Sequence, residues 1–353
     1  MRNFQKKKRL LLGMLILTGM CFCLMVAGCK KKVAENEKPS NTYVIGVLLA
    51  YDSPTSTEVF KAMQERLDDY QRKTGDKLKV ITQKAHGQVS LLPDQARQLA
   101  RESKLLVAIS TPALQSAMIA TDSLPIVFSS VANPYILRAG RTAVDHDQRV
   151  TGVCSTAPIR QVMELIRQVF PEVKKIGTIW TPSEINSEYY LDLMKDAASD
   201  SGLEVISQPV SRAQDIVQAV QSLVRDRIEV LFPVSDNTIN ANFDLVGRLA
   251  EENGRPLFAA FALGAEFGAC ASMGFDFRDI GLKTAEIIIR IRNGESPTRI
   301  PFQYIDRVRF YVNDEAARKQ GVKFPESILK KTDQLVKARG QIGNISGTIP
   351  KSE

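Results

Sequence analysis

The stretch from Lys174 to Tyr190, KKIGTIWTPSEINSEYY, places an apolar run directly before a polar turn and the start of a helix. Ile176 to Trp180 is typical of a buried parallel strand, and helical spacing of apolar residues begins at Tyr189. Thr181 to Ser187, between them, supplies hydroxyl, amide and carboxylate groups. In open α/β sheets, ligands bind where strands end, because the next helix presents N–H groups and a partial positive charge there. The stretch therefore predicts a site for a small anionic molecule.

The same order of strand, polar turn and helix recurs on both sides of this stretch. The expected strands are Tyr43–Ala50, Lys77–Lys84, Leu105–Ile109, Pro125–Ser130, Arg149–Cys154, Glu204–Val210, Ile228–Val234, Pro256–Phe261, Ala269–Phe275 and Phe302–Val312. A final helix is expected over Asn313–Leu329. Right-handed crossovers bring all the turns of a parallel sheet to one edge. About 310 residues are enough for two lobes of ordinary domain size, so the sequence predicts an α/β protein with two doubly wound sheets.

The first 42 residues indicate export. A basic segment ending at Arg9 precedes an apolar run from Leu10 to Val26, and small residues lead to Cys29. This order is typical of a secretory signal peptide that ends in what resembles a bacterial lipobox, which implies cleavage before Cys29 and lipidation of its thiol. The alternative is an uncleaved signal anchor, since the apolar run is just long enough to cross a bilayer. Residues 30–42 are charged and lack apolar periodicity, so they predict a flexible tether.

The excess of positive charge belongs to this leader. The whole chain has a net charge of +8, but eight of its 47 basic residues precede position 33, where there is no acidic residue. The remainder has 39 basic and 39 acidic side chains and is neutral. We therefore expect no nucleic-acid partner, because the basic residues mark a targeting segment and not a binding face.

Two cysteines remain beyond the leader and the lipidation site, Cys154 and Cys270. They pair in an oxidising compartment if the fold brings them together, but two distant cysteines do not establish a disulfide from sequence. Buried free thiols are the favoured interpretation, because an unpaired cysteine usually behaves as a small core residue. Neither cysteine has a histidine nearby in the sequence that would activate it as a nucleophile.

Five blocks of the sequence together resemble the ABC-transporter substrate-binding lipoproteins of the tryptophan/tyrosine type, within the type 1 periplasmic-binding-protein fold. The blocks are AISTPALQSA, RVTGV, IGTIWTPSEINSE, LFPVSDNTI and GACASMGFDFRDIGLKTAEIIIRIRNGESP. The resemblance implies two Rossmann-like lobes with parallel sheets, joined by hinge strands and closing on a solute. The expected organisation is signal peptide 1–28, lipidated tether 29–42, lobe 1 at 43–150 plus 275–304, lobe 2 at 151–274 plus 305–332, and a loose tail at 333–353.

The resemblance also implies residue roles. Hydroxyl, amide and N–H donors to a ligand carboxylate are expected from Thr111, Gln115, Ser183, Asn186 and Ser187. Asp236 is expected to accept from a ligand ammonium with Asn237 beside it, although an aspartate before a helix equally suits a simple N-cap. Residues expected at or near the cleft are Asn133 and Asp276, with Tyr51, Phe128, Trp180 and Phe261 against the ligand's side chain or in the core. The first turn, Asp52–Thr57, lacks the histidine that the family often has there.

The leading functional interpretation is capture of a small solute by hinge closure and its delivery to ABC permease subunits in the membrane. The expected solute is an amino acid, with aromatic ones favoured by the resemblance; branched or sulfur-containing amino acids, purine-like solutes and small peptides stay open. A sensor lipoprotein of the same fold is the alternative. An enzyme is not expected, because His86 and His146 lack metal-ligand spacing and no nucleophile elbow, P-loop or dinucleotide fingerprint is present. We expect no cofactor or metal, a monomer, and a lipid-anchored protein that faces the periplasm or the cell exterior.

Overall fold

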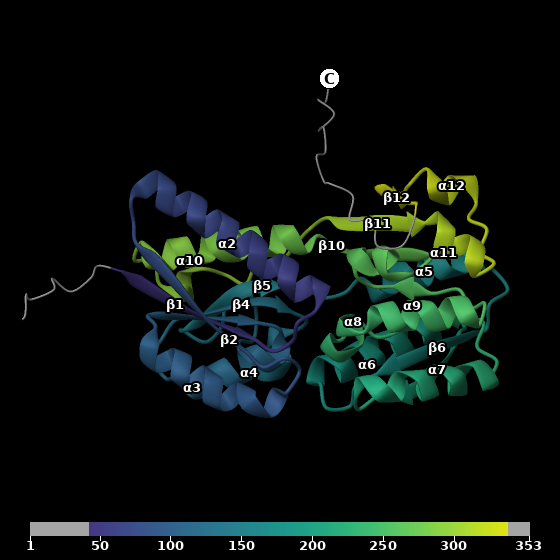
Figure 1. Cartoon of the computed structure of the whole chain (residues 1–353), viewed down its shortest axis with the longest axis horizontal. Helices are drawn as coiled ribbons and strands as arrows, with labels where there is room; N and C mark the ends of the chain where they lie inside the picture. The colour runs from purple at the N-terminus through teal and green to yellow at the C-terminus, as the bar shows by residue number, and fades with distance from the viewer. Residues whose placement is uncertain (1–41, 338–353) are drawn as a thin grey trace, which may run out of the picture. The chain divides into compact units, whose positions relative to one another are not determined.

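The computed structural model describes residues 42–337, which form two α/β lobes, each with helices on both faces of its sheet (Figure 1). Lobe 1 consists of residues 42–154 and 277–303, and lobe 2 of residues 159–275 and 308–336. Four buried apolar clusters fill the two faces of the two sheets, two clusters in each lobe. The α/β fold with two lobes that the sequence predicted is confirmed. The predicted signal peptide, Cys29 and nearly all of the tether lie outside the described residues.

The sheet of lobe 1 is parallel throughout, in the order β2-β1-β3-β4-β5. Its strands are β1 (Tyr43–Leu49), β2 (Leu78–Lys84), β3 (Leu105–Ile109), β4 (Ile126–Val131) and β5 (Val150–Cys154). Its helices are α2 (Pro54–Thr74), α3 (Leu92–Glu102), α4 (Thr111–Ala120) and α10 (Phe277–Arg292), with short 3₁₀ turns η1 (Val89–Leu91), η2 (Pro134–Leu137) and η5 (Pro297–Arg299). Strands β3 and β5 are buried along their whole length, as expected for parallel strands covered on both faces.

Helices α2 and α10 pack on one face of this sheet, and α3 and α4 on the other (Figure 1). The close approach of α10 to α2 depends on Gly281, since a Cβ atom there would lie 2.4 Å from the carbonyl oxygen of Val59. Serine caps the start of α2: the Ser53 side chain accepts from the N–H of Ser56, and the Ser56 hydroxyl lies 3.1 Å from the N–H of Ser53. Because α10 packs on α2, lobe 1 is assembled from two segments that lie far apart in the sequence.

The sheet of lobe 2 consists of the groups β7-β6-β8 and β9-β10-β11-β12, joined by one bridge between Leu231 and Leu257. Its strands are β6 (Lys175–Trp180), β7 (Glu204–Pro209), β8 (Val230–Leu231), β9 (Phe258–Ala259), β10 (Ala271–Phe275), β11 (Val308–Asn313) and β12 (Gln334–Val336). Its helices are α5 (Ile159–Val169), α6 (Ile185–Asp200), α7 (Ile216–Arg225), α8 (Asn237–Ala241), α9 (Phe243–Glu252), α11 (Asp314–Lys319) and α12 (Glu326–Leu329), with η3 (Ala213–Asp215) and η4 (Ala262–Phe267). Only the pairing of β10 with β11 is antiparallel among the described strands.

The chain passes between the lobes three times: after β5, after β10 and before β11. The first passage differs from the expected boundary at residue 150, because β5 pairs with β4 and belongs to the sheet of lobe 1. The end of lobe 2 differs as well. Gln334–Val336 pairs with β11 as strand β12, so the chain is ordered beyond the expected boundary at 332.

The expected final helix over Asn313–Leu329 is wrong as a single element. It is divided into α11 and α12 by residues 320–325. Gly321 adopts a left-handed φ of 71°, which ends the first helix, and Pro325 starts the second. The apolar spacing continues across the break, which is why periodicity alone joins the two segments.

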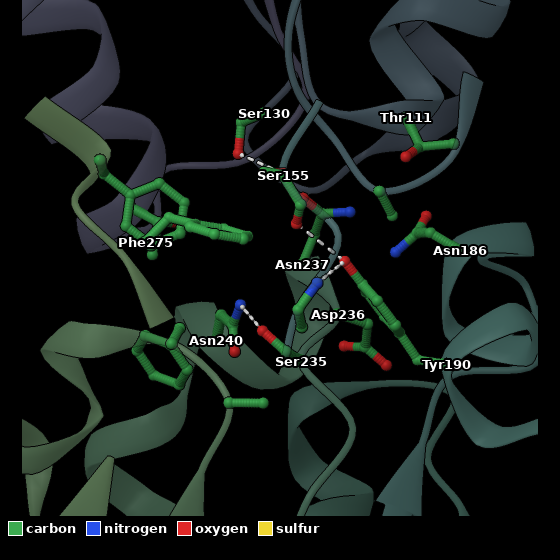
Figure 2. Close-up of a pocket in the computed structure, with 16 residues that line it drawn as sticks. Thr111, Ser130, Ser155, Asn186, Tyr190, Ser235, Asp236, Asn237, Asn240 and Phe275 are labelled. Carbon is green, nitrogen blue, oxygen red and sulfur yellow. Dashed lines mark hydrogen bonds between the residues drawn. The ribbon is translucent and has the colours of Figure 1, made fainter. Parts of the chain in front are cut away.

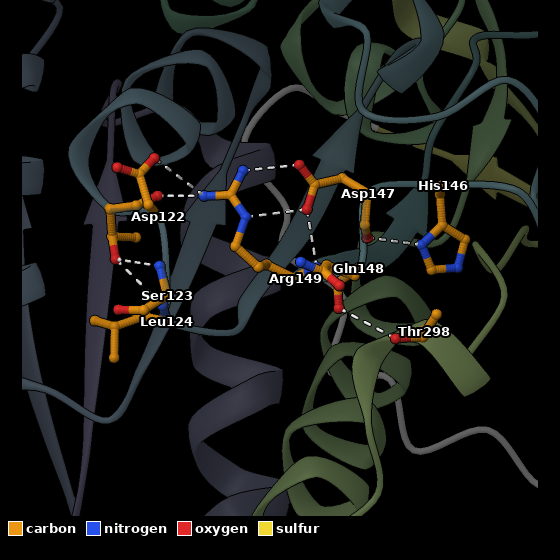
Figure 3. A network of polar contacts seen from close by, with 9 residues as sticks. Asp122, Ser123, Leu124, His146, Asp147, Gln148, Arg149 and Thr298 are labelled. Carbon is orange, nitrogen blue, oxygen red and sulfur yellow. Dashed lines mark hydrogen bonds and ion pairs between the residues drawn. The ribbon is translucent and has the colours of Figure 1, made fainter.

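Arg149 fixes the chain just before β5 (Figure 3). Its guanidinium donates to both carboxylate oxygens of Asp147, at 2.7 and 3.0 Å, and to the carbonyl of Thr121. These bonds hold the pKa of Asp147 below its usual range. Next to this pair, the ring of His146 stacks on Phe302 with centroids 4.6 Å apart. Arg149 thus anchors the start of β5, the strand that ends at the first passage between the lobes.

Cys154 and Cys270 are both free and buried. Cys154 ends β5 in lobe 1, whereas Cys270 lies in the core of lobe 2 beside β10. Burial raises the pKa of the Cys154 thiol to about 12 and also raises that of Cys270. Both cysteines are therefore buried free thiols, as the sequence analysis favoured, and do not form the alternative disulfide. No helix of residues 42–337 is both long and apolar enough to span a bilayer.

Candidate ligand-binding site

A cavity between the lobes lies where strands end and helices begin (Figure 2). About 480 Å³ of space lies between its walls, part of which is open to solvent. Lobe 1 contributes Thr55, Thr111, Ser130 and Ala132; the passages between lobes contribute Ser155, Ala157, Phe275 and Phe277; lobe 2 contributes Asn186, Tyr190, Ser235, Asp236, Asn237, Asn240, Ala260 and Phe261. Asp236 is the one charged side chain in this lining, all of which belongs to the described part of the chain.

Asp236 is buried and held by three donors. One carboxylate oxygen accepts from the N–H of Thr181 at 3.0 Å and from the Ser187 hydroxyl at 2.7 Å, and the other accepts from the N–H of Ile239 at 2.8 Å. A carboxylate has about four acceptor positions, so one remains for a ligand. Burial and the Glu184 carboxylate raise the pKa of Asp236 well above its usual range, against the lowering effect of these donors. A cation is the group that would relieve this buried charge best.

Glu184 is a second buried carboxylate, which the sequence analysis did not single out. Its oxygens accept from the backbone N–H groups of Asn237 and Thr238 at 3.1 and 2.9 Å, and from their side chains at 2.6 and 2.7 Å. The amide of Asn186 donates to it as well, at 3.3 Å. Glu184 therefore fixes the start of α8, and with it Asp236, from the turn before α6.

Two helices begin at the cavity without a side-chain cap. The N-cap residues of α4 and α6, Ser110 and Glu184, make no capping hydrogen bond to their own helices, whereas α2, α8 and α10 have one each. Thr111, the first residue of α4, and Asn186, the second residue of α6, line the cavity. Ser110 has a φ of 94° and a ψ of 163°, a strained conformation, and its hydroxyl has no partner among the described residues. Unpaired N–H groups at helix starts are suited to an anion.

Aromatic side chains form another part of the lining. Phe275 and Phe277 flank the passage from β10 to α10, and Phe261 comes from the chain after β9. Figure 2 shows Phe275 on the opposite side of the cavity from Thr111 and Asn186. The cavity thus combines a polar end with an apolar, aromatic side.

The Tyr190 hydroxyl ties lobe 2 to the first passage between lobes. It accepts from the N–H of Ala157 at 3.0 Å and donates to the carbonyl of Ser155 at 3.1 Å. Because Tyr190 lies on α6, this pair of bonds fixes the passage relative to the helix that carries Asn186. Burial raises the pKa of the Tyr190 phenol, so it stays a neutral donor.

The structure brings four of the nine predicted ligand-binding residues to the cavity lining, namely Thr111, Asn186, Asp236 and Asn237, together with Phe261. Ser187 lies behind Asp236 and donates to it. Gln115 and Ser183 are exposed and do not line the cavity, while Asn133 and Asp276 cap η2 and α10. Of the other predicted aromatic residues, Phe128 lies in the core of lobe 1 against Phe302, and Trp180 packs against the core of lobe 2.

Tyr51 reaches from lobe 1 to lobe 2 outside this cavity. Its hydroxyl lies beside the side chains of Thr238 and Glu184, and burial, together with the Glu184 carboxylate, raises its pKa. Asp52, the next residue, contacts Nδ1 of His86, and His86 lies in the turn that follows β2. A histidine is thus present beside the first turn in space, although the first turn lacks one in sequence.

The sequence analysis missed Thr55, Ser130, Ser155, Tyr190, Ser235, Asn240, Phe275 and Phe277. Ser235 adjoins Asp236 and shares its signal, a polar turn after a strand. Phe275 and Phe277 flank Asp276, so the alternation of side chains along an extended strand end was the signal for them. The others come together only through the packing of the lobes. Among residues 42–337, no group of histidine, cysteine, aspartate and glutamate side chains is arranged to hold a metal.

Comparison with known proteins identifies the family. Residues 44–336 match the family described as ABC transporter substrate binding protein. A tyrosine-binding protein of Clostridioides difficile (strain R20291) is 29% identical over 321 residues, which are 89% of this chain and 92% of that protein. Two solved structures are each 27% identical to this chain.

The ABC domain from Streptococcus pneumonia in complex with L-Trp has a TM-score of 0.77, covering 83% of this chain and all of that one. The ligand-free, open structure of a substrate-binding protein with adhesive properties from Clostridium difficile has a TM-score of 0.64, covering 84% and 100%. At equal identity, the chain superposes more closely on the L-Trp complex. The match over residues 44–336 shows that the chain belongs to the ABC transporter substrate-binding proteins, which are extracytoplasmic solute-binding proteins and not enzymes.

Proposed function

We propose that this protein captures an amino acid with an aromatic side chain between its lobes and delivers it to the permease of an ABC importer. The observation that carries the proposal is the pairing of one buried carboxylate, Asp236, with two uncapped helix starts in a single cavity. An α-amino acid has a cation and an anion on the same carbon atom. Its ammonium matches Asp236, and its carboxylate matches the starts of α4 and α6.

The lining supports the aromatic side chain. Phe261, Phe275 and Phe277 offer rings to the cavity, and edge-to-face or offset contacts between rings are favourable beyond the burial of area. The relatives support the same class, since one is named for binding tyrosine and another was solved with L-Trp. Thr111, Asn186 and Asn237 remain proposed ligand contacts beside Asp236.

We also infer a lipid anchor at Cys29. The lipobox-like end of the apolar leader supports lipidation, and the charged residues 30–42 would serve as a tether long enough to let the lobes reach a permease. Incorporation of labelled palmitate tests the anchor. Cys29→Ser removes the label if the proposal is right, and an unchanged label contradicts it.

Ligand-dependent thermal stability tests the capture of an amino acid. The compact unit beginning at Thr42 contains all four apolar clusters, so the test uses the chain from residue 30 onward. A ligand present at a hundredfold its Kd should raise the Tm by about 5 °C. Tyrosine, tryptophan and phenylalanine are compared with aliphatic amino acids, nucleobases, sugars and dipeptides.

Two matched variants separate ligand binding from helix capping. Asp236 and Asp276 both cap a helix with their side chains, but only Asp236 lines the cavity. Asp236→Asn should abolish the ligand-induced rise in Tm, and Asp276→Asn should leave it in place. Equal shifts for both variants would contradict the role of Asp236, and no shift of the unaltered protein with any aromatic amino acid would contradict the proposed solute.

A further inference from the structure

Two buried amide oxygens in the cavity have no hydrogen-bond partner. Asn186 and Asn240 are 3% and 8% exposed, and both line the cavity. The Oδ1 atom of each lacks a partner within the part of the chain that the structure describes. A buried acceptor without a partner is costly, so such atoms mark places where a ligand supplies a donor.

The amide nitrogens of the same two residues are already engaged. Asn186 Nδ2 donates to Glu184 at 3.3 Å, and Asn240 Nδ2 donates to the Ser235 hydroxyl at 3.1 Å. Since a carboxylate only accepts, the partner of Asn186 fixes its amide with the oxygen away from Glu184. In Asn240, the bond to Ser235 occupies the nitrogen and leaves the oxygen without a partner.

The two oxygens lie toward different ends of the cavity. Figure 2 shows Asn186 near Thr111, at the uncapped helix starts, and Asn240 with Ser235 on the side of Phe275. Because an amide oxygen only accepts, the unpaired Oδ1 of Asn186 is suited to the ligand's ammonium and not to its carboxylate. Asn240 is placed to meet the ligand's side chain among the aromatic rings.

We propose that Asn240 selects ligands whose aromatic ring carries an N–H or O–H donor, so that tyrosine and tryptophan bind and phenylalanine is rejected. The inference rests on the proposed function and narrows its substrate class. A phenylalanine ring carries no donor and would leave the buried Asn240 Oδ1 unpaired, whereas an N–H or O–H on the ring would pair it. By the usual cost of an unpaired buried acceptor, phenylalanine should bind at least about tenfold more weakly.

Matched ligand pairs test the proposal on the unaltered protein by isothermal titration calorimetry. Tyrosine is compared with phenylalanine, and tryptophan with 3-benzothienylalanine, in which sulfur replaces the indole N–H at nearly the same size. The donor-bearing member of each pair should bind about tenfold more tightly or better. O-methyltyrosine, which accepts but does not donate, should bind as weakly as phenylalanine.

A variant pair assigns the selection to Asn240. Asn240→Leu removes the oxygen with little change in shape and should bring both ligand ratios close to one. Asn242→Leu is the control, because Asn242 lies just after α8 and does not line this cavity. It should keep the ratios of the unaltered protein. Thermal unfolding of both variants checks that they fold.

Each outcome decides between the alternatives. Equal binding of both members of each pair, with aromatic amino acids still bound, overturns the selection and leaves the proposed function standing. Selection that persists in Asn240→Leu assigns the donor contact to another residue. O-methyltyrosine binding as tightly as tyrosine would show that Asn240 presents its nitrogen. Failure of every aromatic amino acid to bind overturns the proposed function first.

Discussion

The two walls of the cavity are built in opposite ways. In lobe 2, Asp236, Glu184 and Ser187 form a closed hydrogen-bond network, beside which the amide oxygens of Asn186 and Asn240 have no partner among the described residues. In lobe 1, the strained residues Ser110 and Ser130, with φ of 94° and 55°, stand at the ends of β3 and β4, and the Ser110 hydroxyl has no partner among the described residues. Lobe 2 thus holds a preformed half-site. Lobe 1 instead presents strained backbone at two of its strand ends.

The largest effect is expected from the network of lobe 2. Glu184→Gln replaces an acceptor of five hydrogen bonds with an amide, whose NH₂ group faces buried donors. Unfolding in urea should show a loss of about 3 kcal/mol, because several buried donors lose their partner. Glu188→Gln, in the first turn of the same helix but exposed, is the control and should stay within about 0.5 kcal/mol. A similar small change for Glu184→Gln would show that the network is not preformed.

A smaller effect of opposite sign is expected in lobe 1. The conformation of Ser110 is one that glycine adopts readily, so Ser110→Gly should raise the free energy of unfolding by about 1 kcal/mol. Ser53→Gly is the matched control. Ser53 caps α2 from an ordinary extended conformation, and its loss should lower stability by a few tenths of a kcal/mol. Destabilisation by Ser110→Gly would mean that the strain of lobe 1 is only apparent.

The smallest effect concerns the contact between the walls. Tyr51→Phe removes the hydroxyl that lies beside Thr238 and Glu184 of lobe 2, so only the closed state loses a polar contact. The ligand should bind about three- to fivefold more weakly, mainly through faster dissociation, as measured by stopped-flow fluorescence. Tyr70→Phe removes a hydroxyl bonded at 2.7 Å to Asp76 within lobe 1 and should leave the dissociation rate unchanged. The same rate for both variants would argue against Tyr51 as a contact that favours closure.

The fold and part of the site were predictable from local pattern. Apolar runs followed by polar turns located the strand ends, and Thr111, Asn186 and Asp236 follow such ends directly. Gln115 does not line the cavity, because one helical turn carries its side chain about 6 Å away from the strand end. Asp276 does not line the cavity, because side chains alternate along an extended segment and Phe275 and Phe277, on either side of Asp276, are the ones directed toward the cavity.

Contacts between distant segments were not predictable from one sequence. Glu184 pairs with Asn237 and Thr238 more than fifty positions away. Asn240 reaches the cavity only because the short helix α8 turns it there, and no spacing rule distinguishes it from Asn242. Local patterns therefore identified the edge of each sheet, but not the partners that the opposite edge brings.

The packing of α10 on α2 has a consequence for the order in which the chain is made. Lobe 1 begins at Tyr43, yet α10, the helix that covers one face of its sheet, ends at Arg292. A ribosome that has produced all five strands of this sheet must still add more than a hundred residues before that face is covered. During this interval the apolar face of α2 has no partner helix. Lobe 1 is therefore completed only after most of lobe 2 has been synthesised.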